Sequence, residues 1–338
     1  MNIQQDVSLK SYNTFGIDVK AAFMAEFSNP QELISLIHDS SYGNLPKLVL
    51  GGGSNILFTK NFEGFVLKNN IPGIEIFEDR GEDVLVKAGA GVKWHSLVTW
   101  CIDKRLGGIE NLSLIPGNTG AAPIQNIGAY GVEIKDTFHE LEAVDITTGI
   151  TTTYNRQQCD FGYRDSIFKR ALKGKVVITS VTFALTRNPV LQLSYGAIEQ
   201  QLKSMGITNP DVKAISDAVC AIRRSKLPDP VKIGNAGSFF KNPEIPGSEI
   251  EALRKLFPGI VSYPLPGGNV KVAAGWLIEQ CGWKGKVIGN TGSHKDQALV
   301  LVNYGNASGN EIWDLALTIQ KSVSEKFGVL IEPEVNVM

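Results

Sequence analysis

The feature that most constrains this chain is a glycine-rich segment at residues 115–131, with the sequence IPGNTGAAPIQNIGAYG. Its seventeen residues include two prolines and mostly small side chains, so they offer little apolar surface for packing. A loop of this length is usually functional or disordered. Ile124, Ile127 and Tyr130 argue against disorder, and the segment therefore predicts a loop that a bound ligand orders.

A shorter glycine-rich loop, LGGGSN, follows a predicted buried strand at 46–50. Successive backbone N–H groups in such a turn can form a concave nest for an anion. The loop nevertheless fits neither the dinucleotide fingerprint GxGxxG nor the phosphate-loop pattern GxxxxGK(S/T). Phosphate binding and a purely structural turn both remain open for this loop.

Charge and cysteine usage limit the classes of function. The 33 Lys and Arg balance 34 Asp and Glu, so the chain has no general positive field for nucleic acid or anionic lipid. The four cysteines form no CxxC pair and the histidines no HExxH motif, which argues against disulfides and a metal site. Because the sequence shows neither a signal core nor a run of about 18 apolar residues, we expect a cytoplasmic protein that stays off the membrane.

At roughly 150 residues per domain, a chain of 338 residues predicts two or three domains. Asn29 and Pro30 predict a helix start, because they suit the N-cap and the first helical position. Further helices are predicted at 94–106, 209–224, 272–281 and 310–327. Strands are predicted at 46–50, 64–68, 73–78, 83–88, 141–146, 150–154, 175–185, 298–304 and 329–334. The mixture predicts an α+β protein with a domain boundary between 200 and 235.

Three short segments carry weak signals when each is taken alone. In FGYRDSIF, Arg164 stands between aromatic residues and a carboxylate, and a packed Arg–Asp pair is the favoured interpretation. In GNAGSFFKNP, Ser238 follows a flexible turn and precedes a predicted strand, where a serine is usually only a turn residue. Glu332 and Glu334 in EPEV follow an apolar strand near the end of the chain, where carboxylates are commonly solvated.

Taken together and in this order, the motifs closely resemble those of the UDP-N-acetylenolpyruvoylglucosamine reductase family. The resemblance runs over essentially the whole chain. Its motifs are YNTFG, LGGGSN, IPG, PIQNIGAYG, FGYRDSIF, LSYG, KLPDP, GNAGSFFKNP, AAGWLI, QALV and EPEV. Because GNAGSFFKNP and PIQNIGAYG are long, chance is a poor explanation for them.

The resemblance implies a two-subdomain FAD-binding fold of the vanillyl-alcohol-oxidase type, followed by a C-terminal α+β substrate domain. The implied domains are FAD-binding subdomain 1 at 1–70, FAD-binding subdomain 2 at 71–204 and the substrate domain at 205–338. It also implies non-covalent FAD. The implied FAD ligands are Gly51, Gly52, Gly53, Ser54, Asn55, Ile115, Pro116, Gly117, Gln125, Asn126, Ile127, Gly128, Tyr130 and Arg223.

For the substrate, the resemblance implies a second set of residues. This set is Tyr195, Lys226, Asn242, Tyr263, Lys271 and Gln297. Tyr195 within LSYG is similar to the closing loop of the family's Tyr-loop, or type I, subtype.

The implied activity is that of an oxidoreductase, a flavoprotein that uses NADPH and FAD to reduce UDP-N-acetylglucosamine enolpyruvate to UDP-N-acetylmuramate. This reaction serves peptidoglycan synthesis, and with it cell wall biogenesis, cell shape and cell division. Hydride from reduced flavin N5 would add to the enolpyruvyl methylene, and a proton would reach the adjacent carbon.

The catalytic residues that the resemblance implies are Arg164, Ser238 and Glu334. Arg164 would stabilise charge that develops on the substrate carboxylate, Ser238 would donate the proton, and Glu334 would act as an acid or orienting group. Glu334 lies four residues from the C-terminus, and chain ends fray unless they are tied down, so its segment must be paired.

Two other functions remain as alternatives. The chain could be an FAD sugar or alcohol oxidase that uses oxygen, or a catalytically silent protein that binds nucleotide sugars. The expected partners are the enolpyruvyl nucleotide and NADPH, without nucleic acid or membrane, and a monomer is favoured.

Overall fold

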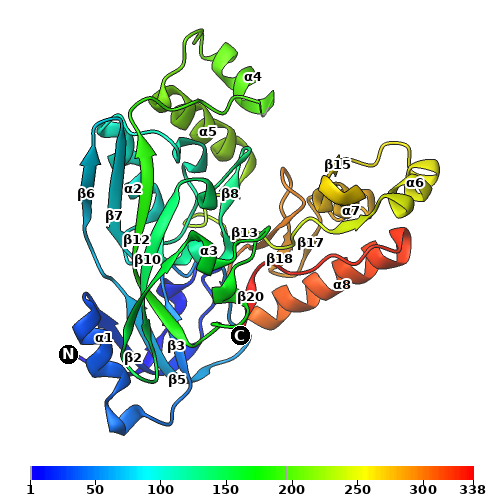
Figure 1. The fold of residues 1–338 in the computed structure, drawn as a ribbon. Helices are drawn as coiled ribbons and strands as arrows, with labels where there is room; N and C mark the ends of the chain where they lie inside the picture. Colours follow the sequence, from blue (N-terminus) through cyan, green and yellow to red (C-terminus); the bar gives the residue numbers. More distant parts are fainter. Residues whose placement is uncertain (1, 195) are drawn as a thin grey trace. The chain divides into compact units, whose positions relative to one another are not determined.

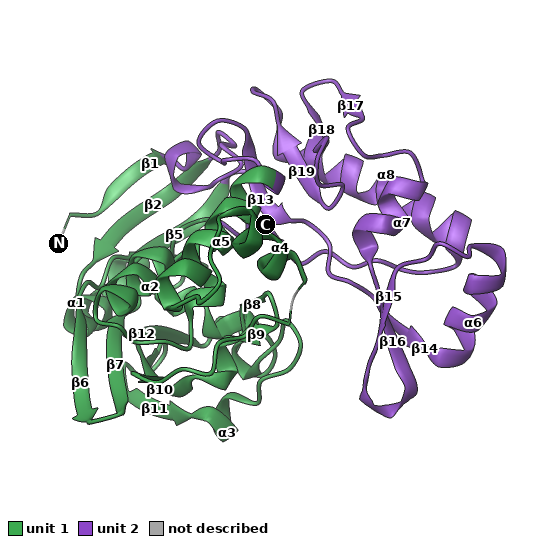
Figure 2. Ribbon diagram, turned by 90° about the horizontal axis from the view of Figure 1, so that it is seen from above, with its two compact units in different colours: residues 1–7, 20–53, 62–225 green, residues 8–19, 54–61, 226–338 purple. Residues whose placement is uncertain are grey.

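The computed structural model describes residues 2–194 and 196–338, and it contains helices and strands throughout (Figure 1). The chain divides into two compact units, which Figure 2 distinguishes by colour. Unit 1 comprises 1–7, 20–53 and 62–225, and unit 2 comprises 8–19, 54–61 and 226–338. The three domains predicted from the resemblance remain a prediction.

Unit 1 contains two principal sheets. One has the strand order β1-β2-β5-β3, in which β5 pairs in parallel with both β2 and β3. The other is antiparallel where its register is defined, with the order β11-β10-β12-β7-β6. The strands are β1 (Gln4–Ser8), β2 (Lys20–Phe27), β3 (Lys47–Leu50), β5 (Phe62–Asn69), β6 (Ile74–Arg80), β7 (Asp83–Gly89), β10 (Phe138–Asp145), β11 (Thr151–Asn155) and β12 (Val176–Thr186), with a small pair β8 (Gly128–Ala129) and β9 (Val132–Glu133).

Unit 1 contains five α-helices in its described residues. They are α1 (Pro30–Ile37), α2 (Trp94–Asp103), α3 (Arg156–Cys159), α4 (Gly196–Ser204) and α5 (Val212–Lys226). Of these, α1, α3 and α5 begin at side-chain caps. The predicted start of α1 is confirmed, because Asn29 Oδ1 accepts a hydrogen bond from Glu32 N at 2.9 Å and Pro30 takes the first position. The predicted strand before LGGGSN is also confirmed as β3.

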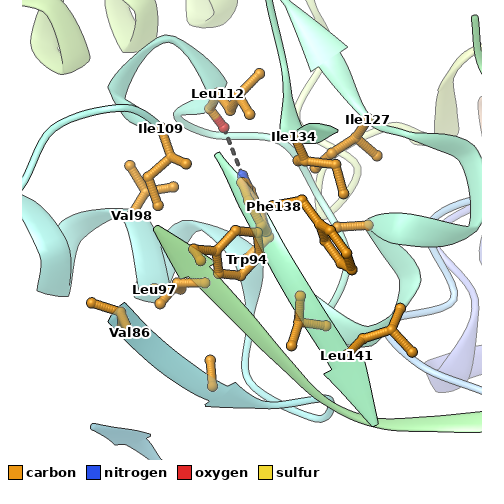
Figure 3. Packing of buried hydrophobic residues seen from close by; sticks show 14 of the residues in the cluster. Val86, Trp94, Leu97, Val98, Ile109, Leu112, Ile127, Ile134, Phe138 and Leu141 are labelled. Carbon is orange, nitrogen blue, oxygen red and sulfur yellow. Dashed lines mark hydrogen bonds between the residues drawn. The ribbon is translucent and has the colours of Figure 1, made fainter. Parts of the chain in front are cut away.

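The largest buried cluster of unit 1 surrounds Trp94, the first residue of α2 (Figure 3). The Trp94 side chain is 1% exposed, and its ring meets Phe183 edge-on with 5.7 Å between centroids. Its indole Nε1–H donates to the carbonyl of Leu112 at 2.8 Å, a bond drawn in Figure 3. The core therefore fixes the start of α2 against the chain that leads into the glycine-rich segment.

Unit 2 combines small sheets with three helices in its described residues. The sheet orders are β13-β19-β18-β17, β14-β16-β15 and β20-β4. The strands are β4 (Ile56–Leu57), β13 (Gly234–Ser238), β14 (Glu244–Pro246), β15 (Ser262–Pro264), β16 (Asn269–Val272), β17 (Val287–Ile288), β18 (Thr291–Ser293), β19 (Val300–Asn303) and β20 (Asn336–Val337). The helices are α6 (Gly247–Leu256), α7 (Ala274–Gln280) and α8 (Gly309–Phe327).

One predicted helix begins later than expected, and one predicted strand does not form. The helix predicted from 209 begins at Val212, because Asp211 Oδ1 accepts from Ala214 N at 2.8 Å and so caps the helix, which places Pro210 before the cap. The strand predicted at 329–334 does not form as a continuous strand. Pro333 makes only an isolated bridge with Phe240, because proline has no N–H to extend a ladder.

Within the described residues, no helix is both long and apolar enough to cross a membrane. The same residues contain no group of three or more His, Cys, Asp or Glu side chains placed to hold a metal ion.

Candidate functional site

The two glycine-rich segments of unit 1 lie directly against each other. A Cβ added to Gly52 would lie 2.9 Å from Gly117 Cα and 3.0 Å from Asn118 Oδ1. A Cβ added to Gly51 would lie 3.7 Å from the Cβ of the same Asn118. Glycine therefore lets the loop after β3 approach the IPG backbone closely. The two loops therefore pack against each other through main-chain atoms and the Asn118 side chain.

The IPG loop is anchored on both sides to the start of α2. Trp94 N donates to Gly117 O at 2.9 Å, and Thr119 N donates to Val92 O at 2.8 Å. Gly120 packs closely against Ala90, whose Cβ would be 2.5 Å from a Cβ at position 120. These bonds hold residues 117–120 through main-chain atoms, which leaves their conformation largely independent of side-chain rotamers.

Asn126 organises the second half of the glycine-rich segment. It is fully buried with φ 43°, and its Nδ2 donates to Gly162 O at 2.9 Å and to Glu133 Oε2 at 3.0 Å. Its Oδ1 accepts from Lys135 N at 3.2 Å. Much of the order in this segment therefore comes from bonds within unit 1.

Arg164 lies beside this segment, at the tip of a tight turn. Gly162 N donates to Asp165 O at 3.0 Å, and Arg164 has φ 53°, in the left-handed region. Its Nη2 donates to Gly128 O at 2.8 Å. Asp165 of FGYRDSIF pairs with Arg170, outside the motif. The guanidinium of Arg164 contacts the glycine-rich segment.

Arg223 on α5 joins the same group of residues. Its Nε donates to Leu114 O at 3.2 Å, just before the IPG loop. Burial lowers the pKa of Arg223 from its ordinary value, and Tyr130, which bonds to its side chain, opposes that shift, while nearby Arg164 adds to it. Leu114, Tyr130, Arg164 and Arg223 are thus neighbours in unit 1, although they are far apart in sequence.

Sequence reasoning missed Lys68, at the end of β5. Its Nζ donates to Gly51 O at 2.7 Å, because β5 pairs with β3 so that Lys68 lies opposite Leu50. Burial lowers the pKa of Lys68, Glu26 opposes the shift and Lys93 adds to it. The signal that could have found this residue is a lysine directly after the apolar run Phe65–Leu67, in the predicted strand that follows the glycine loop.

These residues fit a cofactor that carries a diphosphate. Glycine-rich turns can present successive main-chain N–H groups to an anion, as in known anion nests. Lys68, Arg164 and Arg223 supply local positive charge in a chain whose formal net charge is −1. The predicted cofactor ligands in the loop after β3 and around Gly117 are therefore neighbours in unit 1, with cations nearby.

In unit 2, the structure brings the Ser238 and Glu334 segments together. Ser238 is the exposed last residue of β13, after Gly237 with φ 70° and a register shift. Glu334 N donates to Phe239 O at 2.8 Å, and Lys241 N donates to Glu332 O at 3.0 Å. The expectation that Glu334 must be paired is met by backbone bonds to the residues that follow Ser238.

Asn55, predicted as a flavin ligand, also contacts the Glu334 segment. Its Nδ2 donates to Glu334 O at 3.3 Å, and its own carbonyl accepts from Asn336 N at 3.2 Å and from Asn336 Nδ2 at 3.0 Å. The end of the LGGGSN loop therefore holds the chain on both sides of Val335.

Two predicted substrate residues meet at the first turn of α7. Asn242 Oδ1 accepts from Ala274 N at 2.9 Å. Gln297 lies beside the next residue, since a Cβ on Gly275 would be 3.4 Å from Gln297 Oε1. The start of α7 therefore orients the Asn242 amide, and the Gln297 amide lies next to the same turn.

Two further predicted substrate residues face each other on the sheet β14-β16-β15. Tyr263 and Lys271 are directly opposite in register, so their side chains share one face. Lys271 Nζ lies 3.8 Å from Glu244 Oε1 on the neighbouring strand. Lys226 is exposed at the end of α5, and Tyr195 lies outside the described residues.

Comparison with protein families and with curated proteins identifies the family of the chain. Residues 21–154 match an FAD-binding domain, and residues 229–338 match the C-terminal domain of UDP-N-acetylenolpyruvoylglucosamine reductase. The enzyme of that name from Amoebophilus asiaticus is 50% identical over 338 residues and covers 100% of both chains. The one from Pseudomonas putida is 50% identical over 333 residues and covers 98% of both.

A solved structure of the UDP-N-acetylenolpyruvylglucosamine reductase from Thermus caldophilus covers 100% of this chain and 99% of its own, with a TM-score of 0.69 and 23% identity. At that identity the likeness shows the fold. The predicted α+β architecture, with an FAD-binding region followed by the family's C-terminal domain, is confirmed. Because relatives that are 50% identical match this chain over 98% of its length or more, the chain belongs to the UDP-N-acetylenolpyruvoylglucosamine reductase family.

Proposed function

We propose that this oxidoreductase reduces UDP-N-acetylglucosamine enolpyruvate to UDP-N-acetylmuramate with NADPH, for the synthesis of peptidoglycan precursors. The net reaction adds one hydride and one proton across the enolpyruvyl C=C bond and converts NADPH into NADP⁺. When bound, FAD would supply the two-electron relay between NADPH and that double bond. The residues of the chain would bind the substrate, stabilise charge and deliver the proton.

The observation that carries this proposal is the pairing of the two unit 2 segments that hold Ser238 and Glu334. A hydroxyl at the exposed end of β13 can reach a substrate, and the bond from Glu334 N to Phe239 O keeps a carboxyl group in the same neighbourhood. Ser238 would give its proton to the carbon next to the substrate carboxylate. An ordinary serine is a weak acid, so it must act on a strongly basic carbon and regain its proton from solvent or a neighbour.

Arg164 would act on the substrate carboxylate, where negative charge builds as the double bond is reduced. Its left-handed backbone and its bond to Gly128 O support this role, because strained residues held by their surroundings are common at functional sites. For substrate recognition, Asn242, Gln297, Tyr263 and Lys271 would bind the nucleotide sugar, with Lys226 as a further cation. Asn126 would order the glycine-rich segment at 115–131, which would bind the flavin.

An absorbance experiment on the purified protein tests this proposal. We expect a yellow protein whose flavin is released into the supernatant by acid, is bleached by NADPH without oxygen, and regains its colour when the enolpyruvyl nucleotide is added. Flavin that responds to oxygen but not to NADPH and the nucleotide would instead favour an oxidase. A colourless protein that binds a UDP-sugar without turnover would favour the silent binding protein.

A further inference from the structure

His95, the second residue of α2, holds the chain that leads into the IPG loop. Its Nδ1 accepts a hydrogen bond from the backbone N–H of Leu114 at 3.0 Å. Leu114 has φ 58°, a left-handed conformation that leucine rarely adopts, while its carbonyl accepts from Arg223. A strained residue directly before Ile115 is thus fixed at both of its backbone polar groups.

Neighbouring bonds fix the same stretch at other points, but through groups that do not titrate. Trp94 holds Leu112 O and Gly117 O, and Val92 O accepts from Thr119 N. Segment 114–117 is therefore held at Gly117 by a main-chain bond that does not titrate. At Leu114 its N–H is held by the His95 imidazole, which does. Loss of the His95 bond would free the Leu114 N–H and leave the bond from Arg223 to Leu114 O, so the segment would be held less firmly at this end.

The environment of His95 requires a neutral ring. A neutral imidazole accepts through one nitrogen and carries its proton on the other. Since Nδ1 accepts from Leu114, the proton is on Nε2, which lies 4.0 Å from Cys220 Sγ. Burial lowers the pKa of His95, and Arg224 and Arg223 on α5 lower it further. The charged or titratable groups that face the ring are Cys220, Arg223 and Arg224, and Lys93 precedes it on its own helix.

We propose that His95 is a positioning residue that keeps segment 114–117 in its flavin-binding conformation, and that proton uptake by the ring releases this segment. The inference rests on the proposed assignment of this loop to FAD. A protonated ring has no acceptor left for the Leu114 N–H.

The direction of the pH effect follows from the lowered pKa of His95 in the folded protein. Above pH of about 6.5, the ordinary value for histidine, both the held and the released segment have a neutral ring and the hold is complete. As pH falls below that value, the released state takes up a proton more readily than the held state, so the hold weakens.

Three substitutions separate the acceptor atom from the rest of the side chain. His95→Asn places Oδ1 near the position of Nδ1 and does not titrate. His95→Gln keeps an amide but moves its oxygen one bond outward, towards the position of Nε2. His38→Asn, at the exposed end of α1, removes one histidine elsewhere in unit 1 and is the control.

Two measurements are made on each protein at pH 8 and pH 5.5. Quenching of flavin fluorescence gives the Kd for FAD, and hydrogen–deuterium exchange of the apoprotein reports the Leu114 amide. At pH 8, His95→Gln should bind FAD about tenfold more weakly than wild type, as expected for the loss of one hydrogen bond. His95→Asn and His38→Asn should stay within about twofold of wild type. At pH 5.5 the wild type should approach His95→Gln, His95→Asn should keep its affinity, and the Leu114 amide should exchange faster wherever binding is weak.

Equal losses in His95→Asn and His95→Gln would overturn the inference, because the acceptor atom would then be irrelevant. So would wild-type affinity and Leu114 exchange that do not change relative to His95→Asn between the two pH values. A wild type that binds no FAD would instead contradict the proposed function, and the amide exchange of the apoprotein would still decide the role of His95.

Discussion

The two units fix their functional side chains by different means. In unit 1, Leu114, Asn126, Tyr130 and Arg164 all have positive φ, between 43° and 58°, and partly buried side-chain hydrogen bonds hold these turns. In unit 2, Ser238 and the Tyr263–Lys271 pair lie in or at the end of strands, and register places them. Backbone strain held by buried polar groups costs of order 1–3 kcal/mol per residue, whereas register adds no such cost. We therefore expect substitutions in unit 1 to affect folding and flavin together, and substitutions in unit 2 to affect catalysis with little effect on folding.

Ser238→Ala should give the largest effect and tests the unit 2 side of this comparison. The residue is exposed, so the fold and the FAD content should survive. Flavin reduction by NADPH should proceed at nearly the wild-type rate, because it needs no proton at the substrate carbon. Re-oxidation by the enolpyruvyl nucleotide should slow by roughly 10²- to 10⁴-fold, typical for a lost general acid, or about 3 to 5 kcal/mol.

Anaerobic stopped-flow at the flavin band separates these two half-reactions. Ser238→Cys keeps a proton donor of similar shape and should lose less than Ser238→Ala. If both half-reactions slow equally, the flavin pocket has been damaged, and if the second does not slow, Ser238 is not the proton donor.

Asn126→Ala tests the unit 1 side. It removes three hydrogen bonds from a fully buried residue with φ 43°, so we expect a loss of about 3 kcal/mol in the free energy of unfolding. FAD content should fall with it, because the turn that holds Arg164 loses its bond at Gly162. Urea denaturation and flavin absorbance measure the two effects. Retained stability with lost FAD would show that Asn126 binds the cofactor directly.

Asn242→Ala and Lys226→Ala compare two predicted substrate residues of unit 2 that differ in their structural contacts. Both should raise KM for the nucleotide sugar and spare the flavin. Only Asn242→Ala should also lower the free energy of unfolding, by about 1 kcal/mol, because it removes the acceptor for Ala274 N. Steady-state kinetics and thermal unfolding distinguish the two residues. Loss of FAD in either variant would show that the residue belongs to the cofactor site and not to the substrate site.

Lys241→Met should give the smallest effect. Its ion pair with Glu332 joins the two segments that carry Ser238 and Glu334, but the two side chains are 38% and 55% exposed. Exposed pairs contribute about 0–1 kcal/mol, and the backbone bond from Lys241 N to Glu332 O remains. We expect a change in unfolding free energy below about 1 kcal/mol and an unchanged rate. A large loss of kcat would show that the pair, and not the backbone, positions Glu334.

Sequence reasoning located the features that depend on local signals. Asn29 marks the start of α1, and LGGGSN follows β3 as predicted. The helix predicted at 310–327 is α8, which begins after the capping box of Ser308 and Glu311 and ends before Gly328 with φ 68°. Each of these signals lies within a few residues of the boundary that it marks.

Features that depend on distant partners were not accessible in the same way. Asp165 pairs with Arg170, and the Arg164 guanidinium donates to Gly128 O, a contact between residues 36 positions apart. Lys68 reaches Gly51 only through the pairing of β5 with β3. His95 acts on Leu114, nineteen positions along the chain, where no motif links them. The family motifs predict the residues of the site, but tertiary contacts decide which of them hold the others in place.

The order in which the ribosome makes this chain matters for unit 2. Early residues in unit 2 bond to very late ones: Asn303 Nδ2 donates to Phe15 O at 2.9 Å, and Thr59 N donates to Met338 O at 2.8 Å. Phe15 and Phe58 are at most 1% exposed in the fold, but they cannot be buried until most of the later chain has been translated. During that interval their apolar surface is open to aggregation and to chaperones, as expected for contacts of long sequence separation. A fragment that starts at residue 226 would lack these early strands and loops, so unit 2 cannot be made complete by expressing its C-terminal part alone.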